Sequence, residues 1–298
     1  MPRETRSSQE GQLNGAPRGT LVVVGTGISV GHLTREAVRH LELADIVLYC
    51  VADVATERLI QTLNPSTEDL YFFYGEDKLR ADTYREMTDR ILHHVRQQRR
   101  VCVAFYGHPG IFANSTHAAL EQARLEGYEA RMLPAVSALD CLFADLGIDP
   151  ASHGCQILEA TQYLCRNRVL DTHSCVILLQ IGCVGDWGWS SKGYDGRNFH
   201  LLTQRLQNVY GSDYEVVVYQ ASQMGILPPL IRVVKLKHLE AGCVSGISTL
   251  YIPPIEHAKL DLDLIARFEQ RKADWASTAN AGTASSTTAH APRPDFNP

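Results

Sequence analysis

The chain has 298 residues, enough for one large or two ordinary globular domains with apolar cores. Hydrophobic residues make up 45% of the sequence and charged residues 20%, a balance typical of soluble globular proteins. The formal net charge of -5 argues against a nucleic-acid partner held by a broad basic face. No apolar stretch approaches the ~20 residues that a transmembrane helix requires, so we expect no membrane partner.

The eight cysteines are scattered, several lie inside apolar runs, and none forms a C-x-x-C pair. They are Cys50, Cys102, Cys141, Cys155, Cys165, Cys175, Cys183 and Cys243. We interpret them as reduced core residues of a cytoplasmic protein, and we expect no metal site. Residues 1–18 are polar, lack the apolar segment of a secretory signal, and are predicted to be disordered.

Strands and helices alternate along the first half of the chain. The predicted strands are residues 20–24, 45–51, 70–74, 100–107 and 129–133, all rich in apolar side chains. The predicted helices between them are residues 34–43, 77–98 and 114–126. Nearly continuous apolar strands separated by helices indicate a parallel sheet that is covered on both faces.

The pattern changes after the segment PAVSALD, and fewer helices separate the strands that follow. The predicted strands are residues 155–160, 175–181, 214–220, 231–239 and 247–254, with a helix at 196–210. Closely spaced strands favour hairpins and a mixed sheet. We therefore expect an α/β fold with two α/β domains, a parallel-sheet domain at 19–134 and a mixed-sheet domain at 135–256. A C-terminal helix is expected at 257–272, and the Ala-, Ser- and Thr-rich tail 273–298 is predicted to be disordered.

Glycine-containing loops follow several strands of the predicted parallel sheet. The first, GTGISVG at 25–31, lacks the G-x-G-x-x-G spacing of dinucleotide-binding proteins. Asp45 precedes the second strand and Asp53 lies too far along the chain, so NAD is only weakly indicated, and a merely tight turn is the alternative. YGHPGIF at 106–112 and PAVSALD at 134–140 follow the fourth and fifth strands. Three such loops at one edge of a parallel sheet predict a ligand-binding cleft.

A polar residue interrupts an otherwise apolar helix face. The residues Arg80, Tyr84, Met87, Ile91 and Val95 are spaced by three and four positions and so share one face of the predicted helix. A guanidinium is seldom placed on a buried face without a partner or a task. Pairing of Arg80 with a neighbouring acid is the bland alternative, and the candidates are Glu76, Asp77 and Asp82.

Three segments together resemble the tetrapyrrole methylase superfamily, the class III S-adenosylmethionine-dependent methyltransferases. They are GTGISVGHLT, YGHPGIF and PAVSALDCLFADLGI, and the resemblance spans roughly residues 19 to 256. The segment YFFYGEDKLRADTYREM further resembles the borosin branch, whose enzymes methylate backbone amide nitrogens of a ribosomal peptide. The resemblance implies a cofactor cleft between the two domains and catalytic roles for Tyr71, Tyr74, Arg80 and Tyr84.

The same resemblance implies that S-adenosylmethionine is the cofactor and S-adenosylhomocysteine its product. The residues carried over to the cofactor site are Tyr106, His108, Ser137, Ala138, Gln180, Tyr219, Ala221 and Thr249. The family also implies a homodimer and a precursor-peptide substrate with a leader or binding region. The clasp region and apolar core peptide of fused borosin enzymes are not recognisable in the tail. We therefore expect the enzyme to act in trans on a separate precursor, and repeated methylation of one precursor is an open expectation.

The expected chemistry assigns a hypothetical role to each catalytic residue. A backbone amide nitrogen is a poor nucleophile because its lone pair is delocalised, so the enzyme must favour an imidate-like state. We expect Tyr84 to take the amide proton, with Arg80 lowering its pKa and stabilising the imidate oxygen. Tyr74 would donate to that oxygen and Tyr71 would orient the peptide, although the sequence does not decide which tyrosine holds which role.

Two alternatives stay open at this point. The chain could be a methylase of the same fold that acts on a tetrapyrrole, an RNA or a protein side chain. It could also be an inactive homologue that binds a leader peptide. Trp187 and Trp189 lie in a glycine-rich loop that fits a lid, a peptide-binding edge or a simply packed loop.

Overall fold

A computed structural model describes residues 19–76, 78–256 and 258–282, with side chains described as far as residue 272. Its contacts divide the chain into two units, residues 1–256 and residues 257–298, and both sheets belong to the first. The strands are β1 (Thr20–Gly25), β2 (Ile46–Cys50), β3 (Thr67–Asp69), β4 (Arg100–Phe105), β5 (Glu129–Met132), β6 (Cys155–Glu159), β7 (Cys175–Leu179), β8 (Glu215–Gln220), β9 (Leu230–Lys235) and β10 (Thr249–Ile252). The helices are α1 (Arg35–Leu43), α2 (Val54–Leu63), α3 (Arg80–Arg96), α4 (Asn114–Leu125), α5 (Ala138–Leu146), α6 (Ala160–Cys165), α7 (Phe199–Tyr210) and α8 (Leu262–Gly282).

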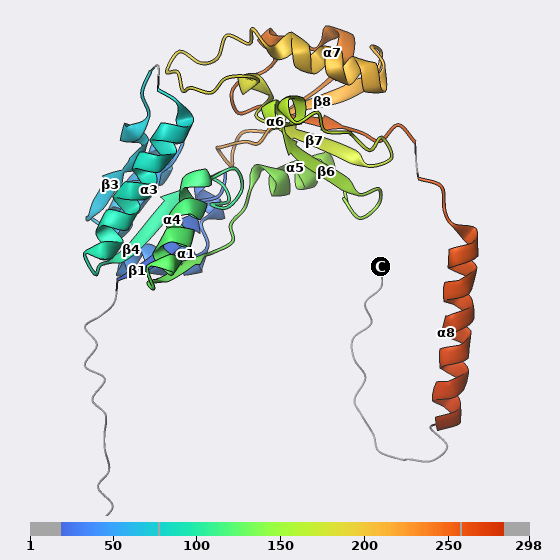
Figure 1. Ribbon diagram of the computed structural model, residues 1–298, viewed down its shortest axis with the longest axis horizontal. Coiled ribbons are helices and arrows are strands. Elements are labelled where there is room, and N and C mark those ends of the chain that lie inside the picture. The colour runs from blue at the N-terminus through green and yellow to red at the C-terminus, as the bar shows by residue number, and fades with distance from the viewer. Residues whose placement is uncertain (1–18, 77, 257, 283–298) are drawn as a thin grey trace, which may run out of the picture. The chain divides into compact units, whose positions relative to one another are not determined.

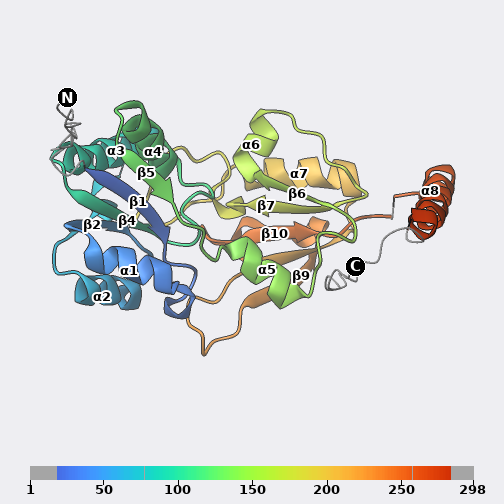
Figure 2. The ribbon, with the colours of Figure 1, turned by 90° about the horizontal axis from the view of Figure 1, so that it is seen from below.

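The first sheet has five strands in the order β3-β2-β4-β1-β5, and every pairing in it is parallel. Side chains that alternate along β1 belong to different cores. Leu21 and Val23 pack with residues of α3 and α4, whereas Val24 packs with residues of α1 and α2. Figure 2 shows these two helix pairs on opposite sides of β1, β2 and β4. Burial on both faces explains why the three central strands, β1, β2 and β4, are apolar along most of their length, as the sequence predicts.

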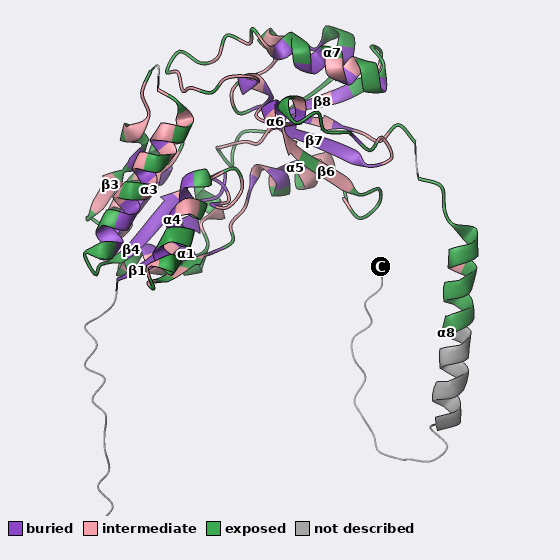
Figure 3. Cartoon of the chain, in the orientation of Figure 1, coloured by how far each residue is buried: buried purple, intermediate pink, exposed green. Residues whose placement is uncertain are grey.

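The second sheet is mixed, in the order β6-β7-β10-β8-β9. Strands β6 and β7 are parallel, and the remaining pairings are antiparallel, including the β8–β9 hairpin. Helices α6 and α7 contribute to the larger core on one face, and α5 packs with Ile177, Leu179 and Tyr219 on the other. Figures 1 and 3 show the buried strand β7 beneath α7, whose outer surface is exposed. The predicted mixed sheet is confirmed.

One predicted strand is wrong. Residues 70–74 do not form the third strand; β3 is Thr67–Asp69, and Leu70–Phe73 form a 3₁₀ helix. The Asp69 carboxylate accepts a hydrogen bond from Tyr71 N at 2.7 Å, so the side chain turns the backbone away from the sheet. Phe72 is consequently 87% exposed despite its apolar neighbours. Apolar content alone does not separate a short strand from this turn.

Helices α2, α5 and α6 are absent from the sequence prediction. Each begins after an acidic or hydroxyl side chain that caps it, namely Asp53, Ser137 and Glu159. Ser137 and Asp140 form a capping box, a signal that the sequence contains. Helix α8 begins at Leu262 and continues to Gly282, past residue 272, where the sequence places its end. Residues 273–282 of the predicted disordered tail 273–298 thus belong to α8, whereas residues 283–298 and the predicted disordered segment 1–18 lie outside the described residues.

Candidate active site

The three loops predicted to form the cleft, two of which contain glycine, meet at the carboxyl edge of the first sheet. Gly27 and Gly107 exchange backbone hydrogen bonds, with N–O distances of 3.3 Å and 2.9 Å. A side chain on Gly25 has no room, because an added Cβ would lie 2.2 Å from Gly107 O and 2.5 Å from the Cβ of Ala135. The structure therefore brings together the loops that the sequence predicts to meet at one edge.

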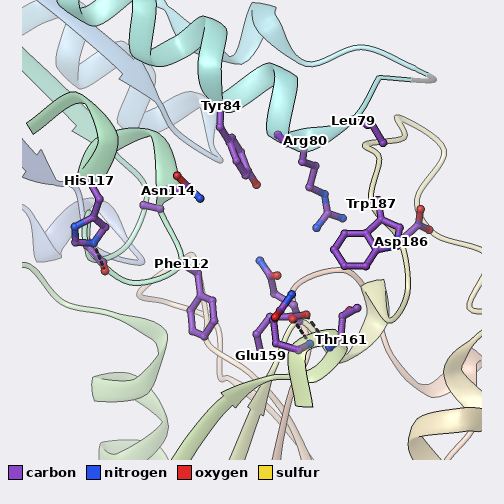
Figure 4. A pocket seen from close by; sticks show the side chains of 15 residues that line it. Leu79, Arg80, Tyr84, Phe112, Asn114, His117, Glu159, Thr161, Asp186 and Trp187 are labelled. Carbon is purple, nitrogen blue, oxygen red and sulfur yellow. Dashed lines mark hydrogen bonds between the residues drawn. The ribbon is translucent and has the colours of Figure 1, made fainter. Parts of the chain in front are cut away.

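Helix α3 carries the predicted stripe into the site. Met87, Ile91 and Val95 are fully buried against the first sheet. Arg80 and Tyr84, one turn apart at the beginning of the helix, are only partly buried. Both side chains line a cavity of about 770 Å³. Figure 4 shows them pointing from α3 into this cavity, opposite Glu159 and Thr161 of the second sheet's half.

A loop from the second half of the unit, residues 185–196, binds the beginning of α3, and we call it the strap. The backbone N–H of Arg80 donates to Trp187 O at 2.9 Å, and Leu79 and Gly188 form an isolated β-bridge. The Glu76 carboxylate accepts hydrogen bonds from the Ser191 backbone at 2.7 Å and from its hydroxyl at 2.5 Å. The strap thus closes one side of the cavity with residues far from α3 in the sequence.

The guanidinium of Arg80 has no carboxylate partner among the residues that the structure describes. Its Nε–H donates to Gly188 O at 2.8 Å, and its carbon lies 5.2 Å from the centroid of the Tyr194 ring. The buried Nη2 has no hydrogen-bond partner in the described part of the chain. Burial opposes the charge of Arg80, but Tyr194, Cys183 and Tyr84 outweigh it and raise the pKa of Arg80.

The acid-pairing alternative for Arg80 fails at two of its three candidates. Glu76 is bound to Ser191, and Asp82 pairs with Arg85 at 2.6 Å. Asp77, the third candidate, lies outside the described residues. As far as the described residues go, Arg80 is a cation whose Nη2 donors are available to a bound molecule.

Tyr71 and Tyr74 pack together with Trp189 of the strap, apart from the cavity lining. The Tyr71 and Tyr74 ring centroids are 5.1 Å apart, and that of Trp189 lies 6.0 Å from Tyr71 and 5.9 Å from Tyr74. Burial, with Cys50 and Tyr84 nearby, raises the pKa of Tyr74 well above its usual value. Tyr74 is consequently a neutral hydrogen-bond donor in this structure, as its hypothetical role requires.

Amide, acidic and aromatic side chains complete the cavity. Its lining residues are Leu79, Arg80, Ala81, Tyr84, Gly110, Phe112, Ala113, Asn114, His117, Glu159, Thr161, Gln162, Gln180, Asp186 and Trp187. Of the twelve residues proposed from sequence, the cavity thus brings together Arg80, Tyr84 and Gln180. Gln180 adopts a left-handed backbone conformation (φ 58°) directly after β7, an unusual geometry for a residue that is not glycine.

Tyr106 and His108 lie in the second glycine loop rather than in the cavity lining. Gln223 Nε2 lies 3.5 Å from the Tyr106 hydroxyl, and burial raises the pKa of Tyr106. His108 Nδ1 accepts a hydrogen bond from Gly110 N at 3.0 Å, so one ring nitrogen serves its own loop. Both residues stay candidate cofactor contacts.

The remaining candidate cofactor residues are held in the second half. The Ser137 hydroxyl donates to Asp140 Oδ2 at 2.6 Å and caps α5, and Ala138 is the first residue of that helix. Tyr219 is fully buried and donates to Asp145 Oδ2 at 2.6 Å, beside Ala221. Thr249 is 4% exposed and pairs with Tyr219 across the sheet. Because the polar groups of Ser137, Tyr219 and Thr249 are already hydrogen-bonded or buried, these residues would shape the cofactor site more than they would donate or accept hydrogen bonds.

Sequence reasoning missed several cavity and strap residues. Tyr194, the stacking partner of Arg80, lies 114 positions further along the chain and follows a glycine with φ 81°. Asn114 and Gln162 begin or continue helices that flank the cavity. The only available signal for Tyr194 was its place in a glycine-rich loop, which does not identify its partner.

The described residues also bear on metal binding, membrane spanning and disulfide formation. Among the described residues, no group of His, Cys, Asp or Glu has the arrangement of a metal site. No helix in the described part of the chain has the length and apolar character needed to cross a membrane. The eight cysteines are all described, and each is a free thiol.

Comparison with known proteins identifies the class. The pattern of the family described as tetrapyrrole (corrin/porphyrin) methylases matches residues 20–224, well over half of the chain. The fold resembles uroporphyrin-III-C-methyltransferase from Thermus thermophilus, with a TM-score of 0.55, 20% identity, and coverage of 80% of this chain and 93% of that one. A cobalt precorrin-4 methyltransferase gives a TM-score of 0.54 at 16% identity, covering 78% and 94% of the two chains. The chain belongs to the tetrapyrrole methylase family.

Within the family, the chain is similar to fungal borosin proteins. It is 46% identical to the methyltransferase/dendrothelin A precursor of Dendrothele bispora and 45% identical to the methyltransferase/omphalotin A precursor of Omphalotus olearius. Both matches cover 84% of this chain and 61% of the relative, so the chain spans less than two thirds of their length. A type III borosin precursor of Anomoporia bombycina is 43% identical, over 86% of this chain and 30% of the relative.

Proposed function

We propose that this protein transfers the methyl group of S-adenosylmethionine to backbone amide nitrogens of a peptide. The observation that carries the proposal is Arg80, a cation with a free, buried Nη2 beside Tyr84 in one cavity. The names of the similar proteins join a methyltransferase to a ribosomal peptide precursor, which supports a peptide as the substrate.

The chain's residues fit the cofactor. The cavity of about 770 Å³ is within the usual range for small-molecule sites, and its lining combines apolar surface with amides and two carboxylates. Gln180 at its wall, with Tyr106 and His108 in the adjoining glycine loop, would hold the cofactor. When bound, S-adenosylmethionine supplies an activated methyl group on a sulfonium.

Arg80 and Tyr84 would prepare the amide. As the nitrogen loses its proton, negative charge develops on the amide oxygen, and the Arg80 Nη2 donors would stabilise it. One preorganised donor of this kind typically contributes ~3–4 kcal/mol to the transition state. The Tyr84 phenolate would take the amide proton and become the neutral phenol, with Tyr74 as a neutral donor and Tyr71 packed beside it. A peptide held in the cavity loses its freedom before reaction, which lowers the barrier further.

The same proposal includes the finer expectations from sequence: action in trans, repeated methylation along one peptide, and a homodimer. Each rests on the borosin resemblance alone. Size-exclusion chromatography with light scattering measures the oligomeric state of the full chain directly, and a monomer at working concentrations would contradict the dimer.

The decisive experiment supplies the full chain with S-adenosylmethionine that carries a deuterated methyl group. One reaction contains a peptide that spans the part of the Omphalotus olearius relative not matched by this chain, and a control omits it. Tandem mass spectrometry should locate labelled methyl groups on backbone nitrogens of the added peptide. Label on the chain's own tail would replace action in trans by action in cis, and label on side chains would overturn amide methylation. An inactive peptide-binding homologue would show no label at all. Calorimetry with S-adenosylhomocysteine tests cofactor binding independently of turnover.

A further inference from the structure

The Arg80 guanidinium is held in place without any neutralising group in the described part of the chain. Its Nε–H is bound by a backbone carbonyl, Gly188 O, and its Nη2 is free. What remains to define the plane of the guanidinium is the ring of Tyr194, 5.2 Å away. A carboxylate in that place would occupy the donors and cancel the charge, whereas an aromatic face attracts the cation and leaves its donors free.

Tyr194 is itself fixed by its surroundings. The ring packs against Gly246, where an added Cβ would lie 3.2 Å from the ring carbon Cε2. Cys183, which is 6% exposed, lies beside the same glycine, with its Sγ 3.6 Å from Gly246 O. A larger residue at 246 would press on the ring, so the position of Tyr194 depends on a residue of the second half of the unit.

Tyr194 is also a neutral side chain. Burial raises the pKa of Tyr194, and the charge of Arg80 opposes this only in part. A neutral phenol does not form an ion pair with Arg80, and the guanidinium carbon lies over the ring, 5.2 Å from its centroid. The Tyr194 hydroxyl is also close enough to act on Arg80 as a hydrogen-bond partner. Such a contact orients the planar guanidinium, and the strap carbonyl of Gly188 fixes its rotation about Nε.

We propose that Tyr194 is a positioning residue for Arg80, holding the guanidinium so that Nη2 faces the amide oxygen of the bound peptide. The inference rests on the function proposed above. Tyr194 does not line the cavity, so it acts through Arg80 and not on the peptide. The strap thereby contributes to catalysis from the second half of the unit, although the residues expected to touch the amide all lie in the first.

The test compares Tyr194→Leu, which removes the ring face, with Tyr194→Phe, which keeps it. The matched control is Tyr214→Leu. Tyr214 is also partly buried and stacks on another ring, with its centroid 5.2 Å from that of Tyr210, but it is not among the residues that line the cavity. In the deuterated-methyl assay, Tyr194→Leu should lower kcat about tenfold, the size expected for one partly buried cation–π contact. Its KM for the peptide should change little, and Tyr194→Phe and Tyr214→Leu should keep the wild-type kcat.

An independent readout does not require activity. In proteins with isotope-labelled arginine, the Nε–H resonance of Arg80, assigned by its loss in Arg80→Lys, should exchange slowly with water in the wild type and in Tyr194→Phe. It should exchange faster in Tyr194→Leu and stay unchanged in Tyr214→Leu. A wild-type kcat and an unchanged resonance in Tyr194→Leu would overturn the inference, as would equal losses in the Leu and Phe variants. Failure of the wild type to methylate any peptide would instead refute the proposed function, and the resonance would still decide the role of Tyr194.

Discussion

Helix α3 presents polar side chains near both of its ends, and the two groups differ in whether a carboxylate pairs with them. Near the C-terminal end, Glu68 binds Arg90 through two hydrogen bonds of 2.6 Å and 2.8 Å. His94 is 3% exposed, and its Nε2 lies 2.9 Å from Glu68 Oε1, an ion-pair contact that lacks hydrogen-bond alignment. The Nδ1 atom of His94 accepts a hydrogen bond from Arg99 at 3.1 Å. At the N-terminal end, Arg80 has a backbone carbonyl and a ring, but no carboxylate among the described residues.

The comparison separates stabilising charge from functional charge on one helix. Paired groups lose little by burial because each satisfies the other, so they hold α3 to β3. An unpaired guanidinium costs free energy unless something binds it, and a site that stabilises developing charge provides that partner during reaction. Changes at the N-terminal end should therefore alter catalysis, and changes near the C-terminal end should alter stability.

Tyr84→Phe should give the largest effect. Removing the hydroxyl that takes the amide proton should lower kcat by about 10²- to 10⁴-fold, the usual range for a general base. Cofactor affinity, measured by calorimetry with S-adenosylhomocysteine, should stay at the wild-type value. Tyr214→Phe provides the control, because its hydroxyl donates to Pro253 O at 3.0 Å, far from the cavity lining. A Tyr84→Phe variant that turned over at the wild-type rate would exclude Tyr84 as the base.

Arg80→Lys should lower kcat by about 10²-fold or more, because lysine keeps the charge but loses the planar donors. The midpoint of urea unfolding should change little. Arg90→Lys, on the same helix, should do the reverse and lower the unfolding midpoint while preserving kcat per folded molecule. If Arg80→Lys and Arg90→Lys both lowered kcat, or both lowered the unfolding midpoint, the distinction between the two ends of α3 would be wrong.

Glu68→Gln should reduce the free energy of unfolding by about 1–3 kcal/mol, since Arg90 and His94 lose the charge of their shared partner. Urea titration followed by circular dichroism measures the loss. Glu126→Gln is the matched control, because Glu126 also binds an arginine of α3 through two hydrogen bonds, of 2.9 Å and 2.5 Å to Arg96. That pair includes no histidine and should contribute less. Equal losses in the two variants would mean that His94 adds nothing to the cluster.

The smallest effect is a pH dependence of stability. Burial lowers the pKa of His94 below its ordinary 6.5, opposed by Glu68 and supported by the charges of Arg90 and Arg99. The unfolded chain therefore takes up this proton first, and stability falls as the pH drops through 6.5 toward the folded-state pKa. A single group can contribute at most about 1.4 kcal/mol per pH unit. Urea titrations at about pH 7 and about pH 5 should show a smaller loss for His94→Gln than for the wild type.

A second window follows at lower pH in both proteins. Burial opposes the charge of Glu68, but its bonds to Arg90 and the charge of His94 outweigh it and lower the Glu68 pKa. Stability from Glu68 is present above the unfolded value of 4.5 and is lost as the pH falls through the folded-state pKa. A pH response of His94→Gln identical to that of the wild type between neutral pH and this window would contradict the assignment to His94.

Several features could be predicted from the sequence because they depend on neighbours along the chain. Continuous apolar strands indicated a doubly covered parallel sheet, and the three- and four-residue spacing of Arg80, Tyr84 and Met87 placed them on one helix face. The glycine loops were predicted to share one edge, and the hydrogen bonds between Gly27 and Gly107 confirm that they do. Local patterns failed at residues 70–74, where the Asp69 side chain ended the strand.

The tertiary structure decided what surrounds the reactive groups. Sequence placed Arg80 on a buried face but could not say whether an acid paired with it, because Glu76, Asp77 and Asp82 all lie within four positions of it along the chain. The hydrogen bond from Arg80 to Gly188 joins residues 108 positions apart. The contacts of Arg80 with Tyr194 and of Tyr71 with Trp189 join residues that are similarly far apart along the chain. Such contacts depend on where two separately folded sheets bring their loops, and no periodicity encodes that. The residue types and their face were therefore determined by the sequence, and the free cation by the packing of the strap.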